Sequence, residues 1–443
     1  MARITPLSGF PEWLPHQRLA EQALVYAVQD VFELHGFVPI ETRAVEPLDQ
    51  LLRKGETDKE IYLLRRLQAE AEDNDAGLGL HFDLTVPFAR YVLENAGRLE
   101  FPLRRYQIQK VWRGERPQEG RYREFLQADI DVVDRGELPF HYEVELPLVM
   151  AEALSRLPIP PVRIQLNNRK VPEGFYRGLG IDDVTTVLRT VDKLAKVGPA
   201  DVQRMLVAAG LTETQAAACL ELAAIKSDDA SFVEEVKRLG SAHPLLDEGL
   251  EELARVVDAG REHASGLFTV DLSVARGLDY YTGTVYETQL VGHEELGSIC
   301  SGGRYDALAT DGDTSYPGVG LSLGVTRLVG RLFAQNLLDV TRKVPTCVLV
   351  ALVDEGSRAA SAGIARTLRN RGIAAQVSPE PAKYGKQIRF ADRRGIPFVW
   401  FPNPDGDEVR DIRSGEQVRA DADSWQPPDD DLRPRLLSSS TQP

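Results

Sequence analysis

Seven basic residues stand within twenty positions of one another, with only Glu115 and Glu119 as acidic neighbours: Arg104, Arg105, Lys110, Arg113, Arg116, Arg121 and Arg123. A solvated charged segment normally mixes the two signs more evenly. Pro117 and Gly120 predict a long hairpin loop between two strand-like segments, 104–113 and 121–134. Arg113 and Arg121 would then stand at the two ends of the hairpin, where guanidinium groups suit bidentate capture of phosphate. The pattern indicates nucleotide binding, although alone it is not specific.

The second segment predicts a strand with one polar face. Alternation in 125–134 places Gln127, Asp129 and Asp131 on one side and Ala128, Ile130 and Val132 on the other. Upstream, HFDLTVPFAR offers Asp83 and Thr85, which share a face if that segment is extended. A solvent-facing side of a sheet would carry the same polar residues. The neighbouring arginines favour a binding surface instead.

The helices and strands around these residues are predicted from the periodicity of apolar positions and from residues typical of helix ends and turns. Apolar positions predict a helix over 15–35 ended by Gly36, a strand over 37–43, and helices from about 184 to 260, where Thr212 and Gln215 fit a capping box. Strand-like segments return at 267–272 and 284–290, and 318–333 predicts a strand running into a helix. After Lys343 the pattern alternates as β-α-β-α-β, which indicates a separate small α/β domain: strands 346–353, 373–377 and 397–401, helices 356–371 and 383–394.

Length and composition exclude several classes of protein. A chain of 443 residues predicts two to four domains. The three cysteines, Cys219, Cys300 and Cys347, lack the spacing of a disulfide framework or a zinc ribbon and favour a reducing compartment. No export signal opens the chain, and the longest apolar run, 347–353, is too short to cross a bilayer. We therefore expect a soluble cytoplasmic protein without a membrane partner.

The net charge of −15 does not exclude a nucleic acid partner, because binding of polyanions depends on local potential. The arginine-rich hairpin is one local basic cluster. Lys386, Arg389 and Arg393, on one face of the predicted helix 383–394, form a second, for which a solvated helix surface is the alternative. The Pro-, Asp- and Ser-rich tail from 426 lacks core-forming residues and is predicted to be disordered.

Several segments in order resemble one family. VWRGERPQEGRYREFLQADIDVVD closely resembles motif 2 of the class II aminoacyl-tRNA synthetases in its histidyl form, and VARGLDYYTGTVYE (274–287) resembles the histidine-specific signature. GVGLSLGVTRL is similar to motif 3, HGFVPIETRAVEP to motif 1, and LHFDLTVPFARY, LRTVDKLAKVG and SGGRYD to further family segments. The resemblance covers about residues 5 to 425.

The resemblance implies an α+β fold: a class II catalytic core built on a six-stranded antiparallel sheet, with a helical insertion and a C-terminal α/β anticodon-binding domain. The expected boundaries are 1–168 and 263–343 for the core, 169–262 for the insertion, 344–425 for the anticodon-binding domain and 426–443 for the disordered tail. Members of the family are homodimers. They join L-histidine to tRNA(His) through a histidyl-adenylate, with ATP as substrate, Mg²⁺ accompanying the nucleotide and no structural metal.

Roles for single residues follow from the same resemblance. Arg113 would contact the α-phosphate, and Arg121 and Arg327 would hold the ATP tail. Arg276 would bridge the histidine carboxylate and the α-phosphate, which makes Arg276 and Arg113 the catalytic pair. Arg116 and Gln118 would meet the acceptor end of the tRNA, while Lys386, Arg389 and Arg393 would face the anticodon loop.

Histidine itself needs two kinds of partner. Asp83, Thr85 and Gln127 could accept hydrogen bonds from its ammonium group, while a neutral imidazole needs one acceptor and one donor, the roles implied for Asp131 and Tyr281. Tyr280 and Tyr305 would line the pocket, with ordinary aromatic core packing as a close alternative. Asp83 and Asp131 stand where many members carry glutamate, so Asp131 would contact the ring directly or through a water.

Three other functions compete. A non-catalytic regulatory subunit of ATP phosphoribosyltransferase shares the catalytic fold but typically lacks the anticodon module. A class II ligase for another amino acid would not be expected to carry RGLDYYTGTVYE. An RNA-binding sensor on the same fold would not need the arginines of an ATP site.

Overall fold

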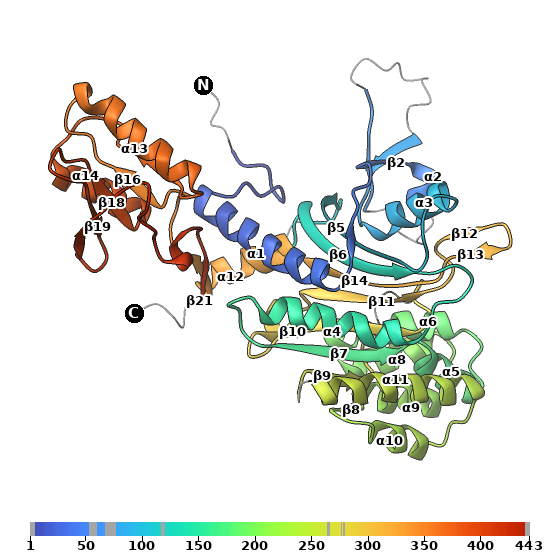
Figure 1. Cartoon of the computed structure of the whole chain (residues 1–443). Helices are drawn as coiled ribbons and strands as arrows, with labels where there is room; N and C mark the ends of the chain where they lie inside the picture. Colours follow the sequence, from blue (N-terminus) through green and yellow to red (C-terminus); the bar gives the residue numbers. More distant parts are fainter. Residues whose placement is uncertain are drawn as a thin grey trace. The chain divides into compact units, whose positions relative to one another are not determined.

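The computed structural model describes residues 5–52, 60–66, 77–116, 120–263, 266–275, 277 and 280–438 (Figure 1). These residues form two compact units. One consists of Met1–Pro11 with Ala27–Arg331, and the other of Glu12–Tyr26 with Leu332–Pro443. Helix α1 (Pro15–Leu34) runs from the second unit into the first. The boundaries proposed from the sequence at 168, 262 and 343 stay predictions.

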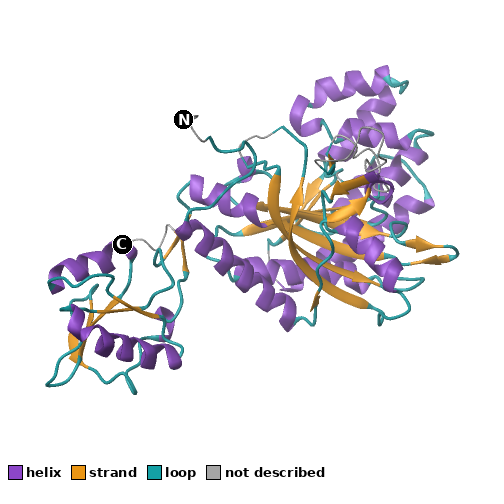
Figure 2. Cartoon of the chain, turned by 90° about the horizontal axis from the view of Figure 1, so that it is seen from above, coloured by secondary structure: helices purple, strands orange, loops and turns teal. Residues whose placement is uncertain are grey.

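A nine-stranded sheet forms the centre of the first unit, in the order β1-β5-β6-β14-β11-β10-β7-β9-β8. Its six middle strands pair antiparallel throughout, which confirms the predicted core: β5 (Leu103–Trp112), β6 (Glu124–Val133), β14 (Gly318–Gly324), β11 (Cys300–Tyr305), β10 (Thr284–Leu290) and β7 (Val162–Asn168). The outer strands are β1 (Val38–Pro39), β9 (Phe268–Asp271) and β8 (Lys226–Ser227). Figure 2 shows the twisted sheet with helices around it.

One face of this sheet is apolar and packs against a helix. Ala128, Ile130 and Val132 of β6 are fully buried on that face, as their alternation predicted. Helix α4 (His141–Ser155) covers β6, β14 and β7. Its Glu143 carboxylate accepts a hydrogen bond from the Thr284 amide (3.0 Å) and pairs with Arg304 (2.9 Å), which fixes α4 to β10 and β11. The opposite face is therefore the one left for a site.

Shorter elements surround the start of the core. Strands β2 (Val45–Pro47), β4 (Leu78–Leu80) and β3 (Tyr62–Leu63) form a small sheet beside α2 (Leu48–Leu51), and α3 (Thr85–Asn95) follows. The strand predicted over 37–43 is limited to β1. Helix α12 (Val325–Ala334) continues directly from β14, as predicted for 318–333. The remaining short elements are η3 (Glu294–Leu296), β12 (Thr310–Asp311) and β13 (Thr314–Ser315).

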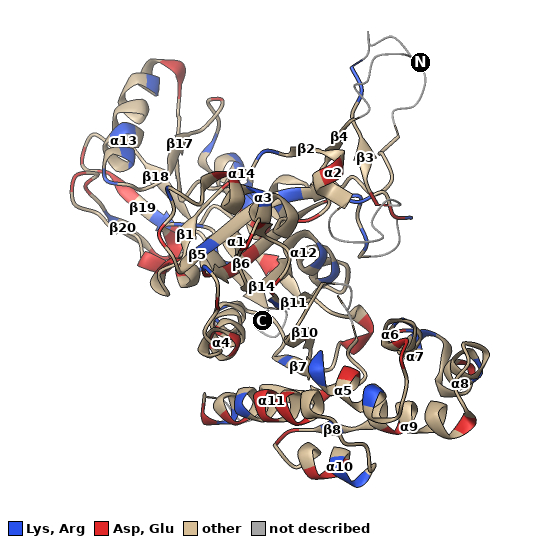
Figure 3. Cartoon of the chain, turned by 90° about the vertical axis from the view of Figure 1, so that its right-hand side faces the viewer, with Lys and Arg blue, Asp and Glu red and all other residues tan. Residues whose placement is uncertain are grey.

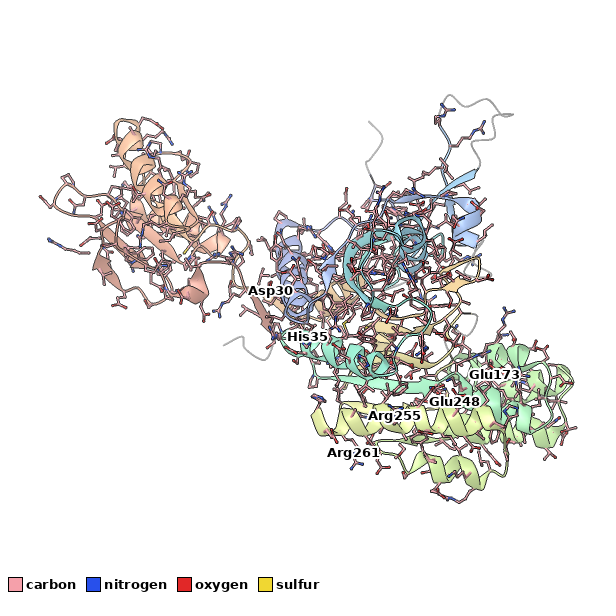
Figure 4. The ribbon with its side chains drawn as sticks, turned by 45° about the vertical axis from the view of Figure 1, so that its right-hand side comes forward. Asp30, His35, Glu173, Glu248, Arg255 and Arg261 are labelled. Atoms are coloured by element: carbon pink, nitrogen blue, oxygen red, sulfur yellow. The ribbon has the colours of Figure 1, made fainter. Side chains whose placement is uncertain are left out.

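The insertion is helical, as predicted, apart from β8. Its helices are α5 (Lys170–Gly178), α6 (Val184–Val191), α7 (Leu194–Val197), α8 (Pro199–Ala208), α9 (Glu213–Ala224), α10 (Phe232–Arg238) and α11 (Pro244–His263). The capping box of Thr212 with Gln215 is present at the start of α9. Helix α11 carries charges of both signs, among them the labelled Glu248, Arg255 and Arg261 (Figures 3 and 4). Lys170 pairs with Glu248 (2.6 Å), which holds α5 to α11.

The second unit contains the predicted α/β module. Its five-stranded sheet has the order β17-β16-β18-β19-β20, with the first three strands parallel: β17 (Ala375–Val377), β16 (Val348–Val350), β18 (Phe398–Phe401), β19 (Glu408–Asp411) and β20 (Gln417–Arg419). Helices α13 (Arg358–Asn370), preceded by η4 (Glu355–Ser357), and α14 (Tyr384–Arg394) connect the parallel strands. Helix α14 ends at Arg394, where the predicted helix 383–394 ends, and Gly395 follows in the left-handed conformation with φ 70°.

The tail differs from its prediction. Residues 426–438 contain η5 (Asp429–Asp431) and β21 (Leu436–Ser438), which pairs with β15 (Leu338–Val340). The Arg342 guanidinium donates to the Asp431 carbonyl at 2.6 Å, and the Leu432 side chain packs against the core of the module. The composition predicted disorder because the segment has few apolar residues. Hydrogen bonds to Arg342 and pairing with β15 order it instead. Residues 439–443 lie outside the described residues. Within the described part of the chain, no helix combines the length and the apolar character that crossing a membrane requires.

Candidate active site

The polar face of β6 forms the floor of the candidate site. Gln127, Asp129 and Asp131 are 7%, 2% and 2% exposed, so this face does not meet solvent as the alternative reading would require. The antiparallel register places Gln109, Gln107 and Arg105 of β5 opposite them on one side, and Gly324, Ser322 and Gly320 of β14 on the other. Residues directly opposite in a ladder share a face. Three strands thus contribute to one polar surface.

Three predicted phosphate ligands and one predicted histidine ligand line a single cavity of about 230 Å³ over this floor. Its wall consists of Arg113, Glu115, Gly120, Arg121, Tyr122, Phe125, Gln127, Ser298, Ile299, Cys300, Ser301, Ser322, Gly324 and Arg327. The hairpin between β5 and β6 and the start of α12 therefore converge, although they are two hundred residues apart in sequence.

Arg113 is held in this cavity by two contacts. Its Nε donates to the Phe82 carbonyl at 2.9 Å, and its guanidinium carbon lies 5.1 Å from the centre of the Phe125 ring. Arg121 pairs with Glu115 at 3.4 Å, while Arg327 donates to the Leu296 carbonyl at 3.4 Å. Gln127 donates from Nε2 to the Ser322 hydroxyl at 2.5 Å. The cationic groups are thus partly ordered by protein contacts, which reduces the entropy lost when an anion binds.

The prediction that Asp83 and Thr85 share an extended face is wrong. The chain bends at Phe82–Leu84, and Thr85 is the first residue of α3. The Asp83 carboxylate accepts from the Val86 amide at 3.1 Å, so it occupies one of the unpaired N–H groups of the first helical turn. Carboxylates favour such helix starts. The competing helix-start signal, an acidic residue before Thr85, was present in the sequence.

Asp131 is the centre of an aromatic cluster. The Tyr305 hydroxyl donates to Oδ1 of Asp131 at 2.7 Å, so Tyr305 does more than fill the core. The rings of Tyr280 and Tyr281 lie 4.1 Å apart, centre to centre. Burial raises the pKa of the Tyr281 hydroxyl well above its usual value, with Tyr280 and the Asp131 carboxylate adding to the effect. Burial and Asp131 likewise raise the pKa of Tyr305. Both phenols stay neutral hydrogen-bond donors.

Glycines make room for this cluster. A Cβ at Gly320 would lie 2.0 Å from Oδ1 of Asp131, one at Gly318 would lie 2.6 Å from the Tyr305 ring, and one at Gly303 would lie 2.9 Å from the Tyr281 ring. No Cβ fits at these distances. The glycines of β14 and β11 therefore let a carboxylate and two phenols lie flat on the sheet.

Two further groups were not assigned from the sequence. Arg105, fully buried on β5, places its Nη2 2.6 Å from Oδ2 of Asp131. The alternation of Arg105, Gln107 and Gln109 with Tyr106 and Ile108 was the signal that could have found it. Asp129 lies between Gln127 and Asp131 on the same face. Burial raises its pKa to about 7; Arg105 lowers it and the Asp131 charge raises it further.

The other predicted site residues are placed as follows. Arg276 and Gln118 lie outside the described residues. Arg116 is exposed, as are Lys386, Arg389 and Arg393, which occupy the face of α14 opposite the buried Gln387 and Ala391. Lys386 pairs with Glu380 at 2.6 Å, and both side chains are 64% exposed. These contacts are compatible with the solvated helix surface as well as with an RNA-binding one.

Comparison with known proteins identifies one family. A sequence model of the family described as "Histidyl-tRNA synthetase" matches residues 9–328. Proteins named "Histidine--tRNA ligase" from Cutibacterium acnes and Micrococcus luteus are 56% and 58% identical to this chain, covering 99% and 98% of it and 100% and 99% of their own length. The crystal structure of histidyl-tRNA synthetase from Nostoc sp. PCC 7120 matches with a TM-score of 0.85 at 35% identity, covering 96% of this chain and 98% of that one.

A more distant match bears on the regulatory alternative. A structure described as an ATP phosphoribosyltransferase regulatory subunit/histidyl-tRNA synthetase from Bacillus halodurans C gives a TM-score of 0.71 at 19% identity, covering 88% of this chain and 97% of that one. At this identity the match shows a shared fold and nothing about function.

Proposed function

The chain belongs to the histidyl-tRNA synthetase family, and we propose that it ligates L-histidine to tRNA(His) at the expense of ATP. The observation that carries the proposal is the single polar face on which Arg113, Arg121, Arg327 and Gln127 share one cavity while Asp131 and Tyr305 form a buried hydrogen-bonded group on the same strands. The proposal also includes a homodimer and a cytoplasmic location.

The first step is adenylate formation. A histidine carboxylate oxygen attacks the α-phosphorus of ATP, and pyrophosphate leaves with the electron pair of the broken P–O bond. This step needs positioning and stabilisation of negative charge more than covalent help. Arg113 would bind the α-phosphate, and Arg121 and Arg327 the leaving pyrophosphate, with Mg²⁺ brought in by the nucleotide. Arg276, by family resemblance, would bridge the two reacting groups.

The second step transfers histidine to tRNA. The terminal ribose hydroxyl attacks the carbonyl carbon of the adenylate, AMP leaves, and the hydroxyl proton is released. Arg116 and Gln118 would meet the acceptor end, and Lys386, Arg389 and Arg393 would lie near the anticodon loop. Sequence-specific recognition of RNA favours unpaired bases such as those of that loop.

Histidine selection uses the buried polar groups. Asp83, Thr85 and Gln127 would receive the ammonium group, Asp131 and Tyr281 would hold the imidazole ring, and Tyr280 and Tyr305 would enclose it. A pocket that hydrogen-bonds its substrate can reject analogues lacking the group by about 10⁴–10⁵-fold. Discrimination of this size removes the need for a separate editing site.

The test is ATP–pyrophosphate exchange with each amino acid in turn, followed by charging of tRNA(His) and one unrelated tRNA. We expect exchange with histidine alone and charging of tRNA(His) alone. Exchange with a different amino acid would identify another class II ligase. Silence with every amino acid would favour the regulatory subunit, against which the full-length similarity to the ligases speaks.

A further inference from the structure

Arg105 is a buried cation that the reaction scheme above does not use. Its side chain is fully buried, its guanidinium carbon lies 4.3 Å from the centre of the Phe88 ring, and its Nη2 lies 2.6 Å from Oδ2 of Asp131. Nε and Nη1 are also buried and form no hydrogen bond with any residue that the structure describes. A buried charge is stable only when it is paired. Asp131 is the acidic partner of Arg105 in this buried ion pair.

Asp131 uses both of its oxygens within the protein. Oδ2 faces Arg105 from β5, and Oδ1 accepts the Tyr305 hydroxyl from β11. An ionised carboxylate oxygen has two lone-pair directions and can accept more than one hydrogen bond. Gly320 of β14 leaves the space in which the carboxylate lies. The carboxylate is therefore oriented by contacts from β5 and β11.

Among the residues that the structure describes, the neighbouring carboxylates work against the charge of Asp131. Asp129 lies on the same face of β6, where the Asp131 charge raises its pKa, and Asp83 beside the start of α3 raises the pKa of Asp129 further. Tyr281 and Tyr305 are buried, neutral phenols beside the carboxylate, and β14 contributes the neutral Gly320 and Ser322. The Tyr305 hydroxyl donates to the carboxylate, which favours its charged form but supplies no positive charge. Two neighbouring buried carboxylates without a cation share a proton readily. A protonated Asp131 would present an O–H where the imidazole N–H needs an acceptor.

We propose that Arg105 is a positioning residue for histidine selection: it holds Asp131 as an oriented carboxylate so that this short side chain accepts the imidazole N–H at neutral pH. The inference rests on the proposed function and deepens its histidine subsite. It is compatible with an aspartate at a position where many family members carry glutamate, because the shorter side chain reaches less far and the arginine fixes its carboxylate in one orientation.

The test compares Arg105→Met, Arg105→Lys and the matched control Arg104→Met in histidine-dependent ATP–pyrophosphate exchange from pH 6 to pH 9. Arg104 is the adjacent residue of β5 and pairs with Glu145 at 2.6 Å, away from Asp131. In the unsubstituted chain and in Arg104→Met, the KM for histidine should be flat above about pH 7, where free imidazole is neutral. Arg105→Met should raise this KM about 10- to 100-fold at pH 7, as expected for loss of a hydrogen bond to a charged group, and leave the KM for ATP within about 2-fold.

The pH profile separates positioning from a merely structural role. In Arg105→Met the KM for histidine should keep falling up to pH 9, because higher pH restores the carboxylate, and Arg105→Lys should return the profile to that of the unsubstituted chain. If Arg105→Met does not fold, Arg105→Gln replaces it and must show the same profile. A KM for histidine that stays within 2-fold, or a rise that does not depend on pH, would overturn the proposal. An unsubstituted chain silent with histidine would instead remove the proposed function and this inference with it.

Discussion

Gly320→Ala is the smallest change that tests the histidine pocket. Gly320 lies in the middle of β14, directly opposite Asp131 in the ladder, and its backbone is not in the left-handed region, so alanine is tolerated by the strand itself. The added Cβ would lie 2.0 Å from Oδ1 and 2.5 Å from Cγ of Asp131. The substitution therefore acts on one carboxylate and leaves every charged group in place.

The size of the effect on histidine binding follows from the contacts that the Asp131 carboxylate would lose. An ordinary contact between these atoms needs about 3.4 Å, so Asp131 must move by more than 1 Å, or the strands must separate. Its bonds to Arg105 (2.6 Å) and Tyr305 (2.7 Å) cannot both survive such a shift. Overpacking of this kind destabilises folding by about 1–3 kcal/mol. Loss of one hydrogen bond between the carboxylate and the imidazole costs about 1.5–3 kcal/mol of binding, or roughly 10- to 150-fold in affinity for histidine.

The assay is histidine-dependent ATP–pyrophosphate exchange, with thermal unfolding measured on the same preparations. Gly363→Ala is the control for the added methyl group, because Gly363 lies in α13 of the second unit, and no described residue beyond its neighbours in the helix lies within 4 Å of an added Cβ. We expect the KM for histidine to rise in Gly320→Ala and to stay near normal in Gly363→Ala. A folded Gly320→Ala chain that keeps its KM for histidine within 2-fold would show that Asp131 does not hold the ring.

Three further predictions concern other parts of the chain. Arg113→Ala should lower kcat for exchange about 10²-fold or more, measured at saturating substrates, because it removes a fixed cation from the triphosphate cavity. Asp129 has a folded pKa of about 7, above its unfolded value, so it lowers stability as pH rises from about 4 to 7; Asp129→Asn should gain stability relative to the unsubstituted chain over that range in urea unfolding. A chain truncated after Trp425 should lose more than about 2 kcal/mol of stability in the C-terminal module, seen as a lower denaturant midpoint, because Arg342 loses the buried Asp431 carbonyl that accepts its N–H.

Local sequence patterns predicted most helices and strands, because at those positions the local conformational preference and the tertiary packing favour the same structure. The capping box at Thr212 and the left-handed Gly395 define helix ends by bonds formed within a few residues. The alternation in β6 predicted both of its faces, since one face packs against α4 and the other carries the site. Where a segment depends on distant anchors, local reasoning failed. The tail after 426 is ordered by Arg342 and by pairing with β15, about ninety residues earlier in the sequence.

Roles for single residues of the candidate site could be proposed from the sequence only where a motif could be matched. Sequence spacing indicated that Gln127 and Asp131 share a face, but it could not show that Tyr305 donates to Asp131, because this contact joins residues 174 positions apart. Nor could it show that the polar alternation in 105–109 lies in register with that of 127–131, which depends on the length of the hairpin. The register of β5 and β6 places Arg105 of one strand opposite Asp131 of the other, where the two side chains form an ion pair.

This register explains why the hairpin holds two functions at once. The loop end of the hairpin carries Arg113 and Arg121 to the cavity, while the far end of its two strands places Arg105 against Asp131. A shift of the register by one residue would move the side chains of the shifted strand to the other face. The apolar face under α4 prevents that shift, because Ala128, Ile130 and Val132 would then leave the core. The stability of the sheet and the proposed selection of histidine therefore depend on the same alternation. Substitutions on the α4 side of β6 should disturb histidine binding only when they also lower the free energy of unfolding.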